Sequence, residues 1–409
     1  MFNIKLTKKV QLMELKFDKY SVLMAGFIVM PLIDSVSGAF HEDFPIGQVY
    51  RVLLFVYMLV LLAQNAQKEF CYASSGYILF TVVQGIVGRA YLMESIKSVM
   101  KLYTPIVTIL LFNCLIKKNK LSKKNIFTIM NIWTIAYPVL VLVPGILGYG
   151  RNAYEGSVGW KGFFYAVNEI SFIMSSMVMY LFWKLSQEIK LTTIILLAMN
   201  CASIALMGTK TGYATIVLFF GIVIISFIKE RNTKKKVRIV ALITFGVMGM
   251  LLVLEKVQSL TAGILGRWQY QRGLSYSITD FLFSMRLRKL QDAVELFLNG
   301  NYFLVGWGLG NEQVGFPNLE MDFFDLLFKT GLLGFTIICF YYLMFFRKIY
   351  KKSIFGTLIV LWSIALSFGA GHVLFSGQSG MMLALTFIYV SQVNKKIWRN
   401  DICSKNGEN

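Results

Sequence analysis

Runs of 17 or more mostly apolar residues recur from one end of this 409-residue chain to the other. About 20 apolar residues are needed to cross the hydrocarbon core of a bilayer as an α-helix. Each run is expected to be helical, because lipid offers no partners to open backbone groups. Only 15% of the residues are charged, against about 25% in soluble domains. The sequence therefore predicts an all-α polytopic membrane protein.

Twelve runs qualify as candidate transmembrane helices. They lie at residues 20–38, 47–65, 74–92, 99–116, 126–147, 163–183, 191–207, 212–228, 238–254, 323–346, 354–374 and 378–394. The predicted organisation is nine spans in residues 1–254, one large extracytoplasmic loop over residues 255–322, and three spans with a tail in residues 323–409. We find no internal sequence repeat, although many secondary transporters have one.

The net charge of +20 is distributed unevenly along the chain. Basic residues gather in every second connection, including residues 117–124, 229–238 and 347–352. An excess of Lys and Arg marks the cytoplasmic loops of a membrane protein. We therefore expect a multi-pass protein of the cytoplasmic membrane with both termini in the cytoplasm. The same pattern accounts for the basic charge without a nucleic-acid partner.

The long loop is expected to be folded. Leu287, Leu290, Val294 and Phe297 recur at helical spacing, which predicts an interfacial helix over Ser284–Leu298 with one apolar stripe.

Two arginines of this helix differ in their local partners. Arg288 has Asp292 four residues on and Glu295 seven on, which predicts a solvated ion pair. Arg286 has no acid three or four residues away. Its guanidinium is therefore expected to bind a phosphate in bidentate geometry.

Residues 306–310 read Gly-Trp-Gly-Leu-Gly and precede a group of acids. The run follows no strand, so we expect a tight turn that approaches a ligand or a neighbouring helix, not a dinucleotide site. Glu320, Asp322 and Asp325 then mark the start of the tenth span, where acids suit a helix N-terminus. Asp325 and Lys329 are four residues apart and are expected to pair.

Several polar residues interrupt or flank the apolar runs: Asp34, Arg89, Lys101, Asn168, Glu169, Lys210 and His372. A charge at mid-membrane costs about 2.5–3.5 kcal/mol on insertion scales, so these side chains should face the bundle interior. The topology puts all of them toward the outer half, where they are expected to form one site. A lone histidine makes a poor metal site. A divalent ion at Glu320 and Asp322 is the alternative that hard oxygen ligands leave open.

Short motifs follow one another along the chain. They are Pro31-Leu32-Ile33-Asp34 with Gly38, Gly159-Trp160-Lys161-Gly162-Phe163-Phe164 with Asn168-Glu169, Gly208-Thr209-Lys210-Thr211, Ser284-x-Arg286 with the glycine run, and Gly371-His372. In order and topology they resemble the bacterial polysaccharide polymerases and O-antigen ligases, a superfamily of membrane glycosyltransferases with a GT-C-like fold. The resemblance spans most of the chain, and its first motif looks like that of Gram-positive members.

The resemblance implies a reaction at the outer leaflet without a cofactor or metal. A growing glycan on undecaprenyl diphosphate would be transferred to the terminal sugar hydroxyl of a lipid-linked repeat unit, yielding a capsule, exopolysaccharide or O-antigen polymer. A flippase and a chain-length regulator are the implied protein partners. The ligases carry a histidine motif after the glycine turn, whereas this chain has Glu320-x-Asp322, which favours the polymerase branch.

This chemistry requires cations for the leaving diphosphate and a base for the hydroxyl proton. Arg286 is predicted to bind the diphosphate. The other predicted substrate-binding residues are Arg267, Arg272, Lys210, Arg89, Glu169 and His372. Glu320 is the predicted base because it lies on the loop side of the tenth span. Asp322 is the first alternative, and Asp325 and Glu169 follow.

Three other functions remain open. A ligase would move finished glycan to a different acceptor with the same donor chemistry. A flippase for lipid-linked oligosaccharides also often has twelve spans, but the missing repeat and the folded outer loop disfavour it. A scaffold in a polysaccharide export complex would tolerate loss of the arginines.

Overall fold

A computed structural model describes residues 18–40, 46–87, 92–154, 158–229, 258–310, 316–350 and 353–392. Within these ranges the chain is almost entirely helical, and six helices are long and apolar enough to cross a membrane. The all-α membrane class is therefore confirmed. The predicted ninth span, residues 238–254, lies outside the described residues.

The first five helices overlap the first five predicted spans, but the third and fourth each begin seven residues earlier than predicted. They are α1 (Lys19–Ala39), α2 (Ile46–Asn65), α3 (Gln67–Val87), α4 (Leu92–Lys117) and α5 (Lys123–Ile146). A short hairpin that was not anticipated follows, in which β1 (Asn152–Tyr154) pairs antiparallel with β2 (Val158–Trp160).

The remaining helices are α6 (Val167–Gln187), α7 (Leu191–Met207), α8 (Lys210–Lys229), α10 (Gln258–Leu274), α11 (Ile278–Leu282), α12 (Arg286–Asn299), α13 (Asp322–Arg347), α14 (Ile354–Ala370) and α15 (Gly377–Gln392). Several of them are shorter than any of the six helices that could cross a membrane. Of these, α13 is long and apolar enough to span, while α7 and stretches of α8 and α14 form shorter apolar helices.

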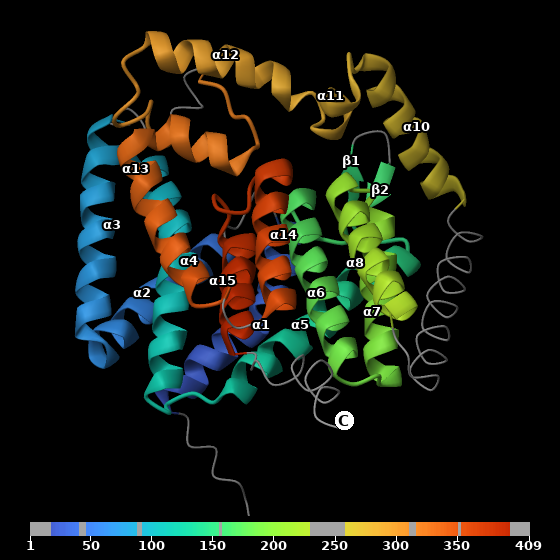
Figure 1. The fold of residues 1–409 in the computed structure, drawn as a ribbon, viewed down its shortest axis with the longest axis horizontal. Coiled ribbons are helices and arrows are strands. Elements are labelled where there is room, and N and C mark those ends of the chain that lie inside the picture. Colours follow the sequence, from blue (N-terminus) through green and yellow to red (C-terminus); the bar gives the residue numbers. More distant parts are fainter. Residues whose placement is uncertain are drawn as a thin grey trace, which may run out of the picture.

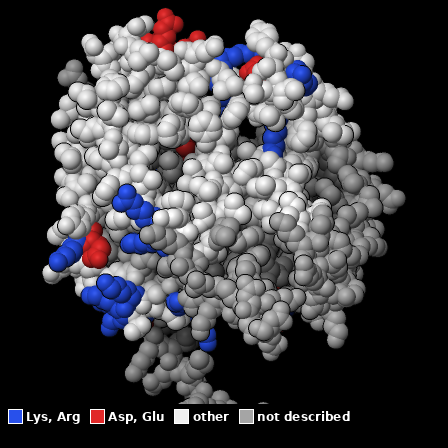
Figure 2. Space-filling model, viewed as in Figure 1, with Lys and Arg blue, Asp and Glu red and all other residues white. Residues whose placement is uncertain are grey.

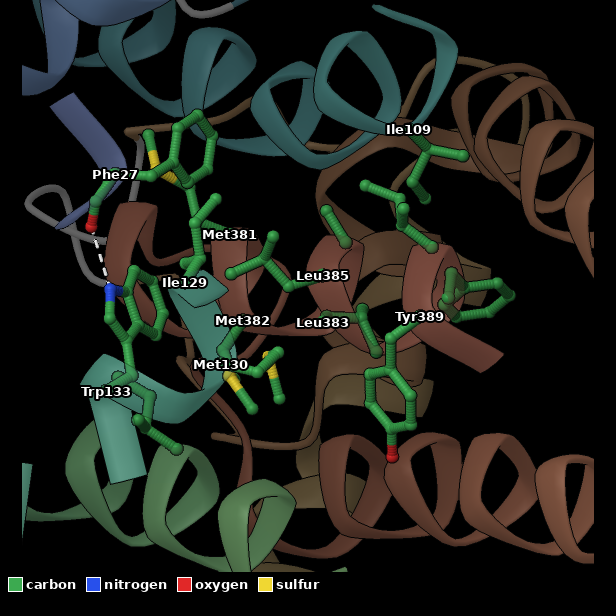
Figure 3. Close-up of a cluster of buried hydrophobic side chains, with 14 of the residues drawn as sticks. Phe27, Ile109, Ile129, Met130, Trp133, Met381, Met382, Leu383, Leu385 and Tyr389 are labelled. Carbon is green, nitrogen blue, oxygen red and sulfur yellow. Dashed lines mark hydrogen bonds between the residues drawn. The ribbon is translucent and has the colours of Figure 1, made fainter. Parts of the chain in front are cut away.

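Helix α15 forms the centre of the bundle (Figure 1). Residues Gly377–Val390 are buried around its whole circumference, as expected of a helix that is surrounded by others. It packs against α4, α5, α6 and α14. Figure 3 shows Met381, Leu385 and Tyr389 within this core. There the indole of Trp133 donates a 2.7 Å hydrogen bond to the Phe27 carbonyl, which joins α5 to α1.

Helices α10, α11 and α12 lie across one end of the bundle, and we call them the cap (Figure 1). Residues 117–124, which include the α4–α5 connection, lie at the opposite end. Their lysines are exposed, and basic side chains gather in the lower left of Figure 2. The long loop and a basic connection thus occupy opposite ends, as the predicted topology requires.

Helix α13 is broken at Gly331, whereas the sequence predicts one continuous tenth span. Gly331 has φ 65° and ψ −176°, a backbone region that is essentially restricted to glycine. The first half of α13 lies beneath α12, and the second half descends beside α4 (Figure 1). The apolar pattern of residues 323–346 conceals the break because both halves are apolar.

The glycine turn fills this break. The backbone of this turn and of the residues just before it makes four hydrogen bonds to α13: Trp307 N to Phe328 O (3.0 Å), Gly308 N to Lys329 O (3.0 Å), Leu332 N to Phe303 O (2.8 Å) and Leu333 N to Leu304 O (3.1 Å). The open ends of both half-helices are thereby satisfied, which lipid could not do. The predicted close approach is confirmed, and its target is a neighbouring helix.

Helix α12 confirms the helix predicted over Ser284–Leu298 within two residues. Ala293 and Phe297 are buried, and Leu287 and Leu290 pack into the same small apolar cluster. Val294 was predicted to belong to this stripe but is 36% exposed. The buried face is therefore turned slightly from the predicted one, because the small Ala293 permits close contact.

Replacing Gly331 with Ala should destabilise the folded protein severely. The backbone conformation alone costs about 1–3 kcal/mol for a residue with a side chain, and the added Cβ would overlap the Leu304 carbonyl group. Thermal unfolding of purified protein in detergent would measure this loss. Gly221→Ala is the matched control, because Gly221 has open space around it on α8. Equal unfolding temperatures for the two variants would contradict this account of the break.

The topology predicts that the cap faces the outside. In a variant without its five cysteines, Gly273→Cys on α10 should react with an impermeant maleimide in intact cells or spheroplasts. Gly273 is exposed and has open space around it. The control Lys120→Cys, in the exposed α4–α5 connection, should react only after permeabilisation. The reverse labelling pattern would overturn the orientation.

Candidate functional site

Four of the predicted site residues meet beneath the cap, where three segments come together. Arg286 begins α12, Glu320 precedes α13, Asp322 begins α13, and His372 lies between α14 and α15. The Arg286 Nη2 atom is 2.6 Å from Glu320 Oε2. The His372 Nε2 atom is 3.8 Å from the other carboxylate oxygen of Glu320, an ion pair rather than a hydrogen bond. Glu320 therefore lies between an arginine and a histidine.

The backbone at this crossing is unusual. Glu320 has φ 55° and His372 has φ 60°, both in the left-handed region that side chains rarely adopt. Gly371 has φ 64° and ψ 176°, and a Cβ there would overlap the Glu320 carbonyl oxygen. The segments that contain Glu320 and Gly371 are therefore in direct backbone contact. Strained backbone of this kind concentrates at functional sites.

Asp322 fixes the position of the histidine. Its carboxylate is buried, and Oδ2 accepts hydrogen bonds from Ser367 Oγ (2.6 Å), Val373 N (2.8 Å) and Leu374 N (2.9 Å). These bonds hold the connection between α14 and α15 against the start of α13. Asp322 therefore has no open face for an incoming sugar.

Asp325 also has a local structural role. Its two carboxylate oxygens accept from the backbone N–H groups of Leu319 and Met321, both at 3.0 Å. Lys329 Nζ lies 3.6 Å from Asp325 Oδ1, which confirms the predicted pair.

Arg286 is paired, contrary to the expectation that it lacks an acid. It bonds Glu320 and also donates to the Gly369 carbonyl at 2.6 Å. The rule of three or four residues missed this partner because Glu320 is 34 residues away along the chain. Arg288 likewise binds Asp280 at 2.7 Å, not the expected Asp292 or Glu295.

Electrostatics bind Glu320 and His372 to each other. The His372 imidazole, followed by the Arg286 guanidinium, lowers the pKa of the Glu320 carboxyl from its ordinary 4.5 to about 2. In return, Glu320 raises the pKa of His372 above its ordinary 6.5, against the effect of burial, with smaller contributions from Asp322 and Glu169. At a pH below the raised value, the group carries Arg⁺, Glu⁻ and His⁺.

Two further predicted cations lie near this group. Lys210 on α8 donates to the Phe281 carbonyl and to Ser284 Oγ (3.3 Å), which ties it to the connection between α11 and α12. Arg267 on α10 lies over the ring of Tyr154, 3.3 Å from its centroid. Lys210 interacts electrostatically with both Arg267 and Arg286. The charge around Arg286 is therefore predominantly positive.

The other predicted residues are dispersed. Arg272 is exposed at the end of α10, and its side chain has no hydrogen bond or ion pair with the described residues. Glu169 lies in the first turn of α6 and reaches the group only electrostatically, through His372. Arg89 lies outside the described residues.

Sequence reasoning missed a second charged pair in the bundle. Arg51 Nη1 on α2 lies 2.6 Å from Asp34 Oδ1 on α1, and Tyr137 on α5 donates to Asp34 Oδ2 at 3.2 Å. The available signal was an arginine inside an apolar run, which needs an interior partner. Asp34 was recognised by this criterion, but Arg51 was not.

The donors and acceptors of this site suit an anionic ligand and proton transfer. In the part of the chain that the structure describes, no three His, Cys, Asp or Glu side chains are arranged to hold a metal ion. Comparison with models of known protein families and with curated proteins finds no match. The function is therefore argued from the residues and their geometry.

The raised pKa of His372 can be measured directly, because the chain has only one other histidine, His41. In a His41→Gln background, the remaining ¹³C-labelled histidine should titrate above its ordinary 6.5 by NMR, and Glu320→Gln should lower that value. Glu188→Gln, at the far end of α6, is the control and should leave the titration unchanged. If the pKa of His372 is the same in Glu320→Gln as in the protein with Glu320, the pair does not form.

The Glu320–His372 pair also determines how the stability of the folded protein depends on pH. His372 contributes stability in full below pH 6.5, and this contribution is lost as the pH rises through its raised pKa. The contribution of Glu320 is present above pH 4.5 and is lost as the pH falls through its pKa of about 2.

Proposed function

We propose that this protein is a membrane glycosyltransferase that polymerises lipid-linked oligosaccharide repeat units into a surface polysaccharide. The growing glycan would be transferred from undecaprenyl diphosphate to the terminal hydroxyl of the next lipid-linked unit, at the outer leaflet of the cytoplasmic membrane. One observation carries the proposal: Arg286, Glu320 and His372, from three separate segments, meet beneath the cap with further cations beside them.

The charge of the group supports a diphosphate as ligand. Arg286, Lys210 and Arg267 supply three cations, and the carboxylate of Glu320 offsets one of them. Arg286 uses Nη1 and Nη2 for Gly369 and Glu320, which leaves further N–H donors of its planar fork for phosphate oxygens. A diphosphate leaving group gains negative charge in the transition state, where fixed cations are most effective.

We assign proton acceptance to His372, with Glu320 as the residue that positions it. With a pKa of about 2, Glu320 is a weak base, although the sequence favours it for this role. A histidine with a raised pKa is a stronger base, and the Glu320 carboxylate stabilises the imidazolium that forms. Asp322 would act indirectly, since its hydrogen bonds hold the segment that carries His372.

The proposed step conserves atoms and charge. The acceptor hydroxyl oxygen bonds to the anomeric carbon of the donor sugar, and the bond from that carbon to the diphosphate oxygen breaks. Undecaprenyl diphosphate leaves with the bonding electrons, near Arg286. The step starts from the neutral His372 imidazole, and the hydroxyl proton passes to its ring nitrogen that does not face Glu320, which gives the imidazolium. No cofactor is required, because the diphosphate is already a good leaving group.

One further observation supports a lipid-linked substrate. The cap exposes a series of apolar side chains that suit contact with the bilayer surface: Leu265, Leu274, Ile278, Leu282 and Leu298. A lipid carrier could therefore approach Arg286 laterally. The resemblance to the polysaccharide polymerases, with Glu320-x-Asp322 in place of the histidine motif of the ligases, favours polymerisation over transfer to another acceptor.

Arg286→Lys should lower polymer formation about 100-fold, the scale of losing a transition-state donor, with expression unchanged. Lysine keeps the charge but loses the planar fork, whose fixed N–H directions serve Gly369, Glu320 and a phosphate together. Polymer length would be followed by electrophoresis after purified protein in liposomes receives lipid-linked repeat units. Arg288→Lys, two residues along the same helix and paired with Asp280, is the matched control.

The products also separate the alternatives. Elongated lipid-linked glycan supports the polymerase, whereas glycan appearing only on an added second acceptor identifies a ligase. Translocation of the lipid-linked unit without new glycosidic bonds identifies a flippase. Normal polymer from Arg286→Lys and Arg286→Ala would refute the assignment of Arg286.

A further inference from the structure

A second polar cluster lies in the bundle interior, apart from the residues beneath the cap. It is built from α1, α2, α4, α5, α6 and α15, through the side chains of Asp34, Arg51, Lys101, Tyr137, Glu169 and Gln378. Such residues in transmembrane helices are costly and usually mark a functional site. The diphosphate chemistry proposed above does not use them.

Half of this cluster is held firmly by the fold. Asp34 is fully buried between the Arg51 guanidinium and the Tyr137 hydroxyl. Gly377, at the start of α15, allows Arg51 to lie against it, since a Cβ there would come 2.6 Å from Arg51 Cδ. Arg51 keeps 18% of its side chain exposed. The fold therefore holds the Arg51–Asp34 pair in place and leaves part of the Arg51 side chain accessible.

The other half has no such anchors. Lys101 and Glu169 are only partly buried, and neither has a hydrogen bond or a close ion pair with the described residues. Lys101 interacts electrostatically with Glu169 and Arg51, and with Glu94 and Lys97 on its own helix. Glu94 and Lys97 are already paired at 2.7 Å. Lys101 and Glu169 thus keep their donors and acceptors available inside the bundle.

The cluster adjoins the proposed base. The carboxylates that influence His372 are Glu320, Asp322 and Glu169, so Glu169 links the two groups of residues. The surface in Figure 2 is hollowed beneath the upper helices. A ligand held by Glu169 would lie on the side of the cluster from which Glu169 acts on His372.

The charge balance of the cluster differs from that around Arg286. Arg51 and Lys101 are matched by Asp34 and Glu169, with a hydroxyl and an amide beside them. A balanced set of donors and acceptors gives no net attraction to a diphosphate. It does match a sugar, whose hydroxyl groups each donate and accept hydrogen bonds.

We infer that Lys101 and Glu169, supported by the Arg51–Asp34 pair, form a subsite for the sugar residues of the acceptor oligosaccharide. This inference rests on the proposed function and divides its site in two: the cations around Arg286 bind the diphosphate of the donor, and the interior cluster binds acceptor hydroxyls. The terminal acceptor hydroxyl would then be presented to His372 from the bundle side. Lys101 and Glu169 set acceptor affinity without taking part in the bond-making step.

Binding measurements on the purified full-length protein in detergent test this division without requiring turnover. Two probes are titrated calorimetrically: repeat-unit oligosaccharide released from its lipid and phosphate, and undecaprenyl diphosphate without sugar. Lys101→Met and Glu169→Gln should weaken oligosaccharide binding at least about tenfold, the scale of a lost hydrogen bond to a charged group. Both variants should bind undecaprenyl diphosphate normally. Arg286→Ala should weaken undecaprenyl diphosphate binding and leave oligosaccharide binding unchanged.

Control variants exclude a general loss of structure. Lys184→Met removes a partly buried lysine of α6 that bonds Asn131 in a different part of the bundle, and should bind both probes normally. Lys101→Arg keeps the charge and donors, and should retain most of the oligosaccharide affinity. Unfolding temperatures of all variants would be compared.

The outcomes separate the inference from the proposed function. Unchanged oligosaccharide binding in Lys101→Met and Glu169→Gln overturns the subsite, as does a wild-type protein that binds no oligosaccharide. Loss of oligosaccharide binding in Arg286→Ala alone would place the sugar beneath the cap and also overturn it. An unchanged affinity of Arg286→Ala for undecaprenyl diphosphate would instead overturn the proposed function.

Discussion

The buried carboxylate of Asp322 is the interaction on which the arrangement beneath the cap depends. One of its oxygens accepts from Ser367 at the end of α14 and from the backbone of Val373 and Leu374. A carboxylate without these donors could not remain buried, because desolvation would be uncompensated. Its hydrogen bonds therefore fix the start of α13 against the turn that carries His372, and Glu320, two residues earlier, is brought to His372 as a consequence. Arg286 completes the group by binding Glu320 and Gly369, which lie on either side of this crossing.

Features that depend on local periodicity were predictable from the sequence. The apolar runs gave the membrane class and the first five helices, and the spacing of Leu287, Leu290 and Phe297 gave α12. The break at Gly331 was not predictable, because its cause is not local. It exists because residues 303–308, which are distant from α13 until the chain folds, supply hydrogen bonds to both half-helices. The signal present in the sequence was the glycine run itself, which predicted a close backbone approach without naming the partner.

The candidate site was likewise predictable only in part. Residue type and position identified Arg286, Glu320, Asp322 and His372, since charges beside apolar runs need an explanation. Their pairing could not be read from spacing, because Arg286 and Glu320 are 34 residues apart and belong to different segments. That pairing determines their chemistry: the pKa of Glu320 is lowered by His372 and Arg286, and the pKa of His372 is raised by Glu320. The favoured base therefore changed from Glu320 to His372 once their partners were known.

A transferase that joins two lipid-linked glycans must distinguish donor from acceptor although both carry the same kinds of group. The charge distribution offers a physical basis for this distinction. The residues around Arg286 have an excess of cations and lie beneath a cap with exposed apolar side chains, which would favour the lipid diphosphate of the proposed donor. The interior cluster around Lys101 is balanced, which would favour the hydroxyl groups of the proposed acceptor. His372 lies between these regions, next to Glu320 and within the electrostatic influence of Glu169. In the proposed reaction, this difference in charge balance would place the diphosphate-linked donor on one side of His372 and the acceptor hydroxyl on the other.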